Sequence, residues 1–202
     1  MKIALIGATG NVGSRLLAEL TRRSHTVTAI VRDPEKVPAQ PGVTAKKGDV
    51  SDPQCLADSL QGHDAVISSV HFTATDPREL VEAVRASGVR RYLIVGGAGS
   101  LEVAPGVRLV DTPNFPEAYK AEATAGAAFL DLLRGETGLD WTFLSPSALF
   151  VARERTGKFR LGKDQLLTGA EGSRISFEDF AIALVDELEK PAHPRQRFTV
   201  AY

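Results

Sequence analysis

The sequence predicts an open α/β fold, a doubly wound parallel sheet with a small C-terminal lobe on the substrate side. Three observations predict it: short apolar or β-branched runs alternate with helical stretches, proline and glycine separate these segments, and the first run ends in a glycine-rich turn. A chain of 202 residues fits one domain with a sizeable core. We expect a single domain, with its core at about 1–146 and the lobe that completes it at about 147–202.

Seven segments are predicted to be strands. "KIALI" at 2–6 is a compact apolar run that ends at glycine, as a buried parallel strand does. "HTVTAIV" at 25–31 is rich in β-branched residues, which favour strands. The other five lie at 42–50, 63–70, 90–97, 139–146 and 197–202. Because helices alternate with them, the sheet should be parallel, and a ligand should lie across the carboxyl ends of its strands.

Five helices are expected between these strands. Asn11 caps the first, and Ser51 or Asp52 before a proline starts the second. The remaining three span about 76–87, 117–134 and 177–189, and the last of them has the clearest helical period.

Two segments interrupt the alternation. Residues 98–116 carry three prolines and no sustained period, and a loop of this length inside a compact domain is usually functional. Residues 153–168 carry the turn residues of a small hairpin.

The net charge and the cysteine content indicate which kinds of partner and which cellular compartment to expect. The formal net charge of −1 gives no reason to expect nucleic acid or a membrane surface as a partner. Cys55 is the only cysteine, which favours a reducing compartment, and the N-terminus lacks the features of a signal peptide, so a cytoplasmic protein is expected. The histidines show no metal-ligand spacing, and we expect no metal site. The expected partner is a small molecule, bound by a monomer or a homodimer.

The strongest chemical signal is "GATGNVG" at residues 7–13. Gly7 ends the first strand, Gly10 lies where the chain passes close to a ligand, and Gly13 lets the helix pack on the sheet. The start of that helix offers free N–H groups and a partial positive charge, which suit a pyrophosphate. We therefore expect Thr9, Asn11 and Val12 to join the three glycines in a dinucleotide site.

The GxxGxxG spacing resembles the short-chain dehydrogenase/reductase superfamily and its Rossmann-type fold. "GATGNVG", "VRDP", "GDVSD" and "GGAGSL" look like an atypical branch that holds NAD(P)H-flavin reductases and is similar to biliverdin reductase B and the NmrA-like regulators. The resemblance runs through "DWTFLSPSALF" and "ISFEDFAIALVDELE" to the end of the chain. By this resemblance, the residues expected beside the cofactor are Asp49 and Val50 near the adenine, Ser68 or Ser69 near the adenosine ribose, Gly96 and Gly97 at the nicotinamide half, and Ser145 and Pro146 at the carboxamide.

The residue after the second strand indicates which dinucleotide binds. A site for NAD usually has a carboxylate about 20 residues beyond the glycines, where it accepts hydrogen bonds from the ribose. Arg32 occupies that region here, and a guanidinium matches a 2′-phosphate. We expect NADP(H) in preference to NAD(H). Asp33 keeps the alternative open, because a small backbone shift would bring it to the ribose.

No residue stands out as the catalytic acid. Typical members of the superfamily use a tyrosine, a lysine four residues later and a serine near the fifth strand. Tyr119 has Ala123 at the position of that lysine, while Lys120 points about 100° away around the helix. Ser100 is a candidate for the serine, although turn formation explains it equally well. His71, after the fourth strand, is a second candidate proton source, with packing beneath the cofactor as its alternative.

Chemistry that needs no positioned acid fits this pattern best. The leading hypothesis is an NADPH-dependent oxidoreductase that transfers hydride to a flavin, a quinone or a similar flat acceptor, so a flavin would be a substrate. The loop 98–116 would cover the acceptor and Phe150 would form an opposite wall, unless both pack internally. The alternative is a non-catalytic NADP(H)-sensing regulator like the NmrA-type proteins. Reduction or epimerisation of a sugar is disfavoured, because it needs a positioned acid.

Overall fold

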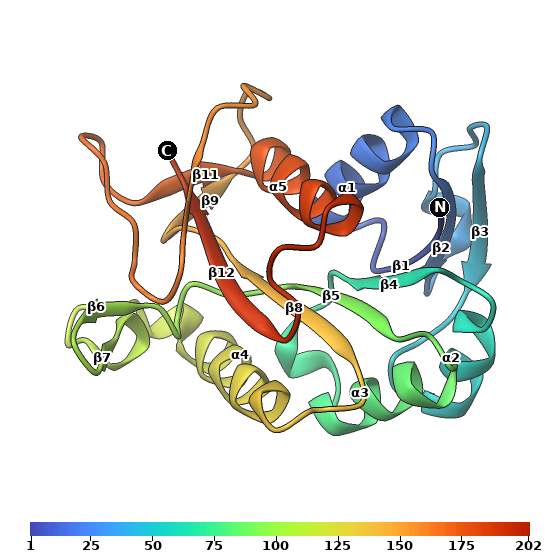
Figure 1. Ribbon diagram of the computed structural model, residues 1–202, viewed down its shortest axis with the longest axis horizontal. Helices are drawn as coiled ribbons and strands as arrows, with labels where there is room; N and C mark the ends of the chain where they lie inside the picture. The colour runs from blue at the N-terminus through green and yellow to red at the C-terminus, as the bar shows by residue number, and fades with distance from the viewer.

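The computed structural model describes all residues 1–202 and has an eight-stranded central sheet in the order β10-β12-β8-β5-β4-β1-β2-β3 (Figure 1). All neighbours in it are parallel except β10 and β12. Its strands are β1 (Lys2–Ile6), β2 (Thr26–Val31), β3 (Val43–Lys47), β4 (Ala65–Ser68), β5 (Arg91–Val95), β8 (Asp140–Ser145), β10 (Arg160–Gly162) and β12 (Gln196–Ala201). The expected doubly wound parallel α/β fold is confirmed.

Five helices cover the sheet on both faces. They are α1 (Asn11–Arg22), α2 (Pro53–Leu60), α3 (Pro77–Ala86), α4 (Glu117–Arg134) and α5 (Phe177–Glu189). In Figure 1, α1 and α5 lie above the sheet and α2, α3 and α4 lie below it. Each face therefore has its own apolar layer: Leu16 and Leu20 of α1 meet Phe180 and Leu184 of α5 in one, while α2, α3 and α4 share the other.

The C-terminal residues complete the sheet instead of forming a separate unit. β12 pairs with β8 in parallel, with Phe198 opposite Leu144. Helix α5 packs on α1 and is buried along most of its length. Only β9 (Leu149–Val151), β11 (Arg174–Ser176) and the connecting loops stand outside the sheet, where β9 and β11 form a parallel pair.

The two irregular segments differ from expectation. The expected hairpin over 153–168 is wrong: within it only β10 is a strand, and it pairs with β12. Residues 98–116 hold a small antiparallel hairpin, β6 (Glu102–Ala104) and β7 (Val107–Arg108), followed by a 3₁₀ turn at Leu109–Asp111. These strands have two or three residues each, too few for a periodic pattern.

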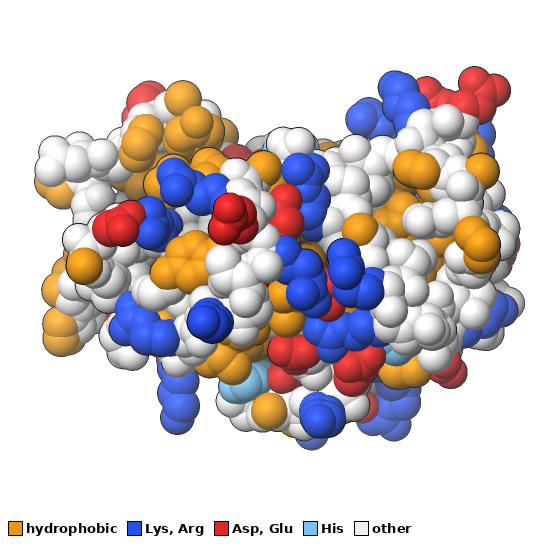
Figure 2. All heavy atoms as spheres, turned by 90° about the horizontal axis from the view of Figure 1, so that it is seen from above, with side chains coloured by type: hydrophobic (Ala, Val, Ile, Leu, Met, Phe, Trp, Pro, Cys, Tyr) orange, Lys and Arg blue, Asp and Glu red, His pale blue; other side chains and the backbone are white.

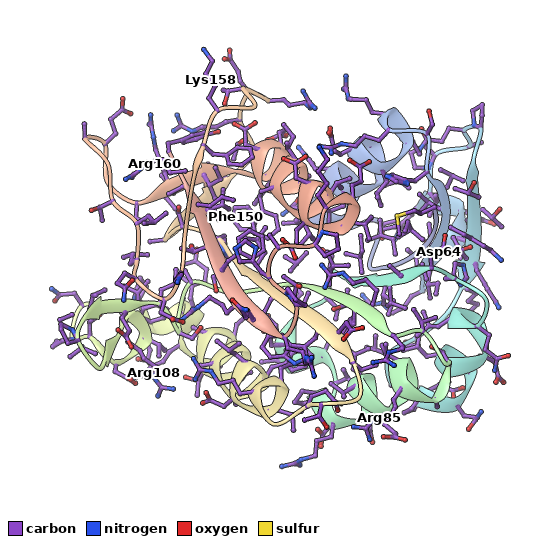
Figure 3. All side chains as sticks on the ribbon, in the orientation of Figure 1. Asp64, Arg85, Arg108, Phe150, Lys158 and Arg160 are labelled. Atoms are coloured by element: carbon purple, nitrogen blue, oxygen red, sulfur yellow. The ribbon has the colours of Figure 1, made fainter.

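Charged side chains of both signs gather over α1 and α5, in the middle of the face shown in Figure 2. Their centre is Glu19, a buried carboxylate that accepts hydrogen bonds from Arg23 at 2.9 Å and from two nitrogens of Arg155 at 2.9 Å. Arg23 also binds Asp186 and Glu189 at the end of α5. This network joins α1, α5 and the loop before β10, whose Lys158 points away from the sheet (Figure 3).

None of the helices combines the length and the apolar character that crossing a membrane requires. Cys55 is exposed and its thiol is free. No group of three or more His, Cys, Asp or Glu side chains lies close enough together to hold a metal ion.

Candidate functional site

The candidate site lies along the carboxyl ends of β2, β1, β4, β5 and β8. β1 stands between β2 and β4, so the connections to its two neighbours leave the sheet in opposite directions. Helix α1 follows β1 on one face, whereas α2 and α3, which flank β4 in the chain, cover the other. Such a switch point leaves a crevice at the strand ends, and nucleotides bind there in open α/β sheets.

The glycine-rich turn after β1 is built by very close backbone contacts. Gly7 has φ of +83°, and a Cβ on it would lie 2.2 Å from the carbonyl oxygen of Ser69. A Cβ on Gly13 would lie 2.0 Å from the carbonyl oxygen of Gly7. Gly10 differs, because a Cβ there would approach no atom closer than 3.5 Å. The first and third glycines are therefore required by the fold itself, whereas the space beside Gly10 is free for a ligand.

The N-terminus of α1 has the properties of an anion site. Gly10 is its capping residue and supplies no side chain, and no acidic residue stands in the first turn. The N–H groups of Asn11, Val12 and Gly13 donate to no group of the chain, while Ser14 N–H donates to Gly10. Thr9, Gly10 and Asn11 are exposed. Three free donors at the positive end of a helix dipole suit a pyrophosphate, so the residues present fit a dinucleotide.

Arg32 stands free at the end of β2. Its side chain is exposed and makes no hydrogen bond or contact ion pair within the chain, although its charge helps to lower the pKa of Asp49. Asp33, next to it, pairs with Lys36 at 3.3 Å. The pair is exposed, so it costs little to break, and Asp33 is less free than Arg32. The available group at this strand end is a guanidinium, whose geometry can match a phosphate.

The residues expected beside the adenine follow β3. Asp49 is exposed, and hydrogen bonding by Ser51, first of all by its backbone N–H at 3.0 Å, lowers the pKa of Asp49. Val50 packs partly against the core beneath α2 and α3, and its carbonyl accepts from the hydroxyl of Thr75. Both residues lie at the expected edge of the sheet, with Asp49 in the charged form.

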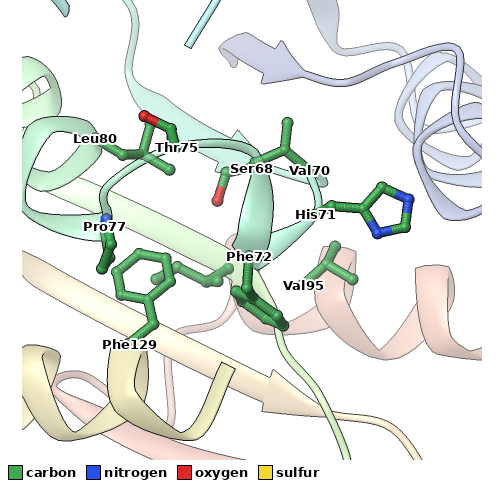
Figure 4. A pocket seen from close by; sticks show the side chains of 10 residues that line it. Ser68, Val70, His71, Phe72, Thr75, Pro77, Leu80, Val95 and Phe129 are labelled. Carbon is green, nitrogen blue, oxygen red and sulfur yellow. The ribbon is translucent and has the colours of Figure 1, made fainter. Parts of the chain in front are cut away.

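The two serines after β4 have different roles. Ser68 is buried, and its hydroxyl lies 2.8 Å from that of Tyr92, whose pKa is raised by burial. The hydroxyl of Ser68 also faces a small pocket beneath the loop that follows, beside Phe72 and Phe129 (Figure 4). Ser69 is half-buried and borders Gly7. Of the two, Ser69 is the one placed beside the glycine-rich turn.

Gly96 and Gly97 end β5, but the first has a structural reason to be glycine. A Cβ on Gly96 would lie 2.4 Å from the ring of Phe143 and 2.6 Å from the carbonyl oxygen of Leu144. A Cβ on Gly97 would lie 3.4 Å from the ring of Phe72, an ordinary contact. Of these two glycines, packing explains Gly96 but does not explain why Gly97 lacks a side chain.

Ser145 and Ser100 lie buried beside a guanidinium that was not predicted from the sequence, and Pro146, next to Ser145, is buried as well. Arg197, in β12, donates to Asp164 at 2.6 Å and lies 3.3 Å from the hydroxyl of Ser100 and 3.4 Å from that of Ser145. Its side chain is almost completely buried. The signal in the sequence was an arginine within the strand segment "RFTVAY", since a charge buried in a strand needs partners.

Tyr119 is not held as a catalytic tyrosine. It stands in the first turn of α4 with 67% of its surface exposed. Lys120 is also exposed and pairs with Glu117 at 3.7 Å. Ala123, at the position where the lysine of typical superfamily members would be, faces Gly99 so closely that a Cβ on the glycine would lie 2.8 Å from the alanine Cβ. The helix packs tightly where that lysine would need room.

Glu122 of α4 is the polar residue of this region that the sequence reading passed over. Its carboxylate accepts hydrogen bonds from the N–H of Phe72 at 2.7 Å and from the hydroxyl of Thr73 at 2.8 Å, and it lies 3.3 Å from Nδ1 of His71. One turn further on, a Cβ on Gly126 would lie 2.7 Å from the Phe72 ring. His71 is thus exposed and tied to α4 and is not packed beneath the site.

The proposed apolar cover is divided between buried and exposed side chains. Leu101 is fully buried, and Leu109 and Phe115 are half-buried. Val103 and Val107, on the β6–β7 hairpin, are exposed. Phe150 packs inward against the rings of Phe177 and Phe180, at centroid distances of 4.6 and 4.8 Å (Figure 3). The ring of Phe150 thus packs on the core, as the stated alternative has it, although the residue remains partly exposed.

Comparison with known proteins agrees with this geometry. The sequence model of a family described as NAD(P)H-binding matches residues 7–191. A crystal structure from Streptococcus pneumoniae TIGR4, provisionally assigned as an NADH-flavin reductase, is 40% identical, with a TM-score of 0.85 over 100% of this chain and 99% of that one.

Two further relatives carry other assignments. A Bacteroides thetaiotaomicron structure provisionally assigned as an epimerase is 42% identical, with a TM-score of 0.95 over 100% of this chain and 96% of that one. The NAD(P)H azoreductase of Xenophilus azovorans is 26% identical over 98% of this chain and 67% of its own length. The glycine-rich turn, the free start of α1 and the matched family model together identify the chain as a member of the NAD(P)H-binding family.

Proposed function

We propose that the protein is an NADPH-dependent reductase of a flavin, a quinone or a similar flat acceptor. The observation that carries the proposal is the contrast between the two halves of the site. The dinucleotide half offers three free N–H donors and an unpaired Arg32. The acceptor half has no tyrosine–lysine pair, because Tyr119 is exposed and Ala123 packs against Gly99.

The chain contributes binding and orientation. The start of α1 would hold the pyrophosphate, Arg32 the 2′-phosphate, and the open strand end at Gly97 would admit the nicotinamide. A reduced nicotinamide, when bound, supplies a hydride. A flat acceptor stacked beside it is already aligned for transfer, so proximity and orientation provide most of the rate.

Two assignments among the relatives bear on the reaction. A reductase of flavins and an azoreductase both pass hydride to flat conjugated acceptors, and that shared feature supports the proposal. An epimerase of a sugar would need an acid and a base fixed on either side of a stereocentre. Ser100 is committed to Arg197 and Tyr119 lies in solvent, so neither is placed to complete the pair of opposed groups that an epimerase needs.

The choice of NADPH over NADH rests on Arg32. We infer that the guanidinium binds the 2′-phosphate, since Asp33 is engaged by Lys36. The loss of a charge-assisted hydrogen bond weakens binding by about 2 kcal/mol, which is roughly 30-fold. Binding constants for NADPH and NADH, measured by fluorescence titration, decide between the two cofactors.

A steady-state screen tests the proposed activity. Oxidation of NADPH is followed at 340 nm with FMN, FAD, a benzoquinone, a naphthoquinone and an azo dye as acceptors. We expect saturable turnover with at least one of them. Tight NADPH binding without turnover of any acceptor contradicts the reductase proposal and favours the second candidate, an NADP(H)-sensing regulator.

The regulator candidate has one observation in its favour. Tyr119 and Lys120 are exposed at the start of α4, and Val103 and Val107 are exposed on the β6–β7 hairpin, and exposed apolar and charged side chains suit a protein contact as well as a substrate. A regulator would change its affinity for a protein partner between NADP+ and NADPH. Equal limited-proteolysis patterns of the two complexes would count against sensing.

A further inference from the structure

Glu122 ties the loop after β4 to helix α4. Oε1 accepts from the N–H of Phe72 at 2.7 Å, and Oε2 accepts from the N–H and the hydroxyl of Thr73 at 3.2 and 2.8 Å. Oε1 also lies 3.3 Å from Nδ1 of His71. One carboxylate therefore fixes three consecutive residues, and it does so across 50 positions of sequence.

His71 stands in the middle of the carboxyl edge of the sheet. Two residues before it, Ser69 borders the glycine-rich turn: if Gly7 carried a Cβ, that atom would lie 2.2 Å from the carbonyl oxygen of Ser69. One residue after it, Phe72 borders the end of β5: if Gly97 carried a Cβ, that atom would lie 3.4 Å from the ring of Phe72. A dinucleotide that runs from the start of α1 to the end of β5 has to cross this segment.

The imidazole of His71 has one nitrogen engaged and one free. Nδ1 faces Glu122, whereas Nε2 has no partner within the chain, and the side chain is 86% exposed. In Figure 4 the ring points away from Phe72 and Phe129. An imidazole oriented by a carboxylate through one nitrogen, with the other open, is the arrangement that general acid–base catalysis uses.

His71 has one charged side chain within ion-pair distance. Glu122 is the charged side chain at ion-pair distance from it, and the neighbouring residues of the pocket wall, such as Val70 and Val95, carry none. Asp76 and Arg78, at the start of α3, pair with each other at 3.5 Å. The carboxylate of Glu122 is therefore the charged group that can orient the imidazole ring of His71.

We propose that His71 is the proton donor of this site and that Glu122 is the positioning residue that holds its ring, an inference that rests on the proposed reductase function. A reduced nicotinamide bound here would give up a hydride, with its own C–H bond broken and its ring oxidised, and the acceptor that takes the hydride would be left with a negative charge on an oxygen or nitrogen atom. The imidazolium form of His71, which carries a proton on both ring nitrogens, releases the Nε2 proton to that atom and keeps the Nδ1 proton that faces Glu122, which completes the two-electron, two-hydrogen reduction of a quinone or flavin. Water reaches the exposed ring and returns the proton.

The pH dependence of turnover tests the donor role. With a quinone as acceptor, kcat/KM of the wild type should fall at high pH, where the donor has lost its proton. H71N should lower kcat at least tenfold at neutral pH and should remove the fall of kcat/KM at high pH, while the Kd of NADPH stays unchanged. Free imidazole should restore part of the lost kcat. An unchanged rate and profile overturns the donor role, and so does a loss confined to NADPH binding that imidazole does not restore.

The variant E122Q tests the positioning role, with E117Q as the matched control on the same helix. We expect E122Q to lower kcat without changing the KM for NADPH, to keep the pH dependence, and to gain nothing from imidazole, because the ring is present but free to turn. E117Q should behave as wild type, since Glu117 binds only Lys120. Equal kcat in wild type and E122Q overturns the role of Glu122.

One readout does not depend on turnover. In the complex of the wild type with NADP+, ring nitrogen chemical shifts should place the proton of neutral His71 on Nδ1, facing the carboxylate, and E122Q should lose this preference. A proton on Nε2 in the wild type overturns the positioning role. If no acceptor is turned over at all, the proposed function and the donor role both fail, whereas turnover with an unaltered H71N fails the donor role alone.

Discussion

The N–H of Phe72 donates a hydrogen bond to Oε1 of Glu122 at 2.7 Å, and this contact joins helix α4 to the loop that follows β4. It gives α4 a function that its tyrosine and lysine do not have. Glu122 holds the loop, Ala123 packs on Gly99, and Gly126 leaves room for the Phe72 ring. The helix face on which a lysine four residues after Tyr119 would stand is here a packing face for two loops of the site.

Arg32→Ala should distinguish the two cofactors. We expect it to raise the Kd of NADPH by about 10- to 100-fold, because a charge-assisted hydrogen bond to the 2′-phosphate is lost, and to change the Kd of NADH by less than about twofold. The measurement is fluorescence titration with each nucleotide. Arg90→Ala is the control, since Arg90 is also exposed but stands just before β5, at the amino end of that strand and away from the candidate site. Equal losses for the two nucleotides would rule out the 2′-phosphate contact.

Two glycine substitutions should separate folding from binding. Gly13→Ala places a Cβ 2.0 Å from the carbonyl oxygen of Gly7, so the turn must shift, and we expect the free energy of unfolding to fall by about 2 kcal/mol or more. Gly10→Ala meets nothing closer than 3.5 Å and should keep its stability while it weakens NADPH binding. Urea unfolding and nucleotide titration of both variants test this. A Gly10→Ala variant that binds as well as wild type would show that no ligand approaches Gly10.

Ala123→Lys restores the tyrosine–lysine spacing but should not create a carbonyl reductase. The site faces Gly99 at close range, and overpacking there should lower the free energy of unfolding by about 1–3 kcal/mol. Ala121→Lys, at an exposed position of the same helix, is the matched control and should unfold like the wild type. Thermal unfolding and an aldehyde-reduction assay are the measurements. A stable Ala123→Lys protein with new carbonyl activity would contradict this account of α4.

The Glu19 network should make stability depend on pH in the acid range. Burial by itself would raise the pKa of Glu19, but hydrogen bonds from Arg155 and Arg23 outweigh it and lower the pKa below its ordinary value of 4.5. A carboxyl with a depressed pKa in the folded state stabilises the protein fully above its unfolded-state value, and this contribution is lost as the pH falls below 4.5 and through the folded-state pKa.

Glu19→Gln should therefore lower the free energy of unfolding by about 2 kcal/mol at pH 7 and flatten its decline in acid. Glu82→Gln, which removes an exposed carboxylate paired with Arg85, should do neither. Urea unfolding between pH 3 and 7 measures both variants. A Glu19→Gln curve parallel to that of the wild type would show that Glu19 does not titrate within the transition.

The parts that sequence predicted well are those with local signals. β1, the glycine-rich turn and α1 follow one another within the first 22 residues, and each has its own apolar period or turn residues. Helix α5 has a long apolar face that leaves no ambiguity. The glycine-rich turn around Gly10 and the strand end at Arg32 could therefore be located in the fold from the sequence, while their contacts with a cofactor stay a prediction.

The parts that sequence missed depend on long-range contacts. β10 is a three-residue strand that exists because it pairs with β12, and the turn residues around it suggested a local hairpin instead. Phe150 lies after β8 as expected, but its ring packs on α5, which only the fold brings near. Glu122 and Phe72 are 50 positions apart, and a single glutamate in an alanine-rich helix gives no hint of its partner.

The measurement that tests the central claim most directly is single-turnover oxidation of enzyme-bound NADPH after rapid mixing with a flavin or a quinone. The account predicts a fast loss of the nicotinamide absorbance, saturable in acceptor, with NADPH bound far more tightly than NADH. Bound NADPH that stays reduced with every flat acceptor would contradict it.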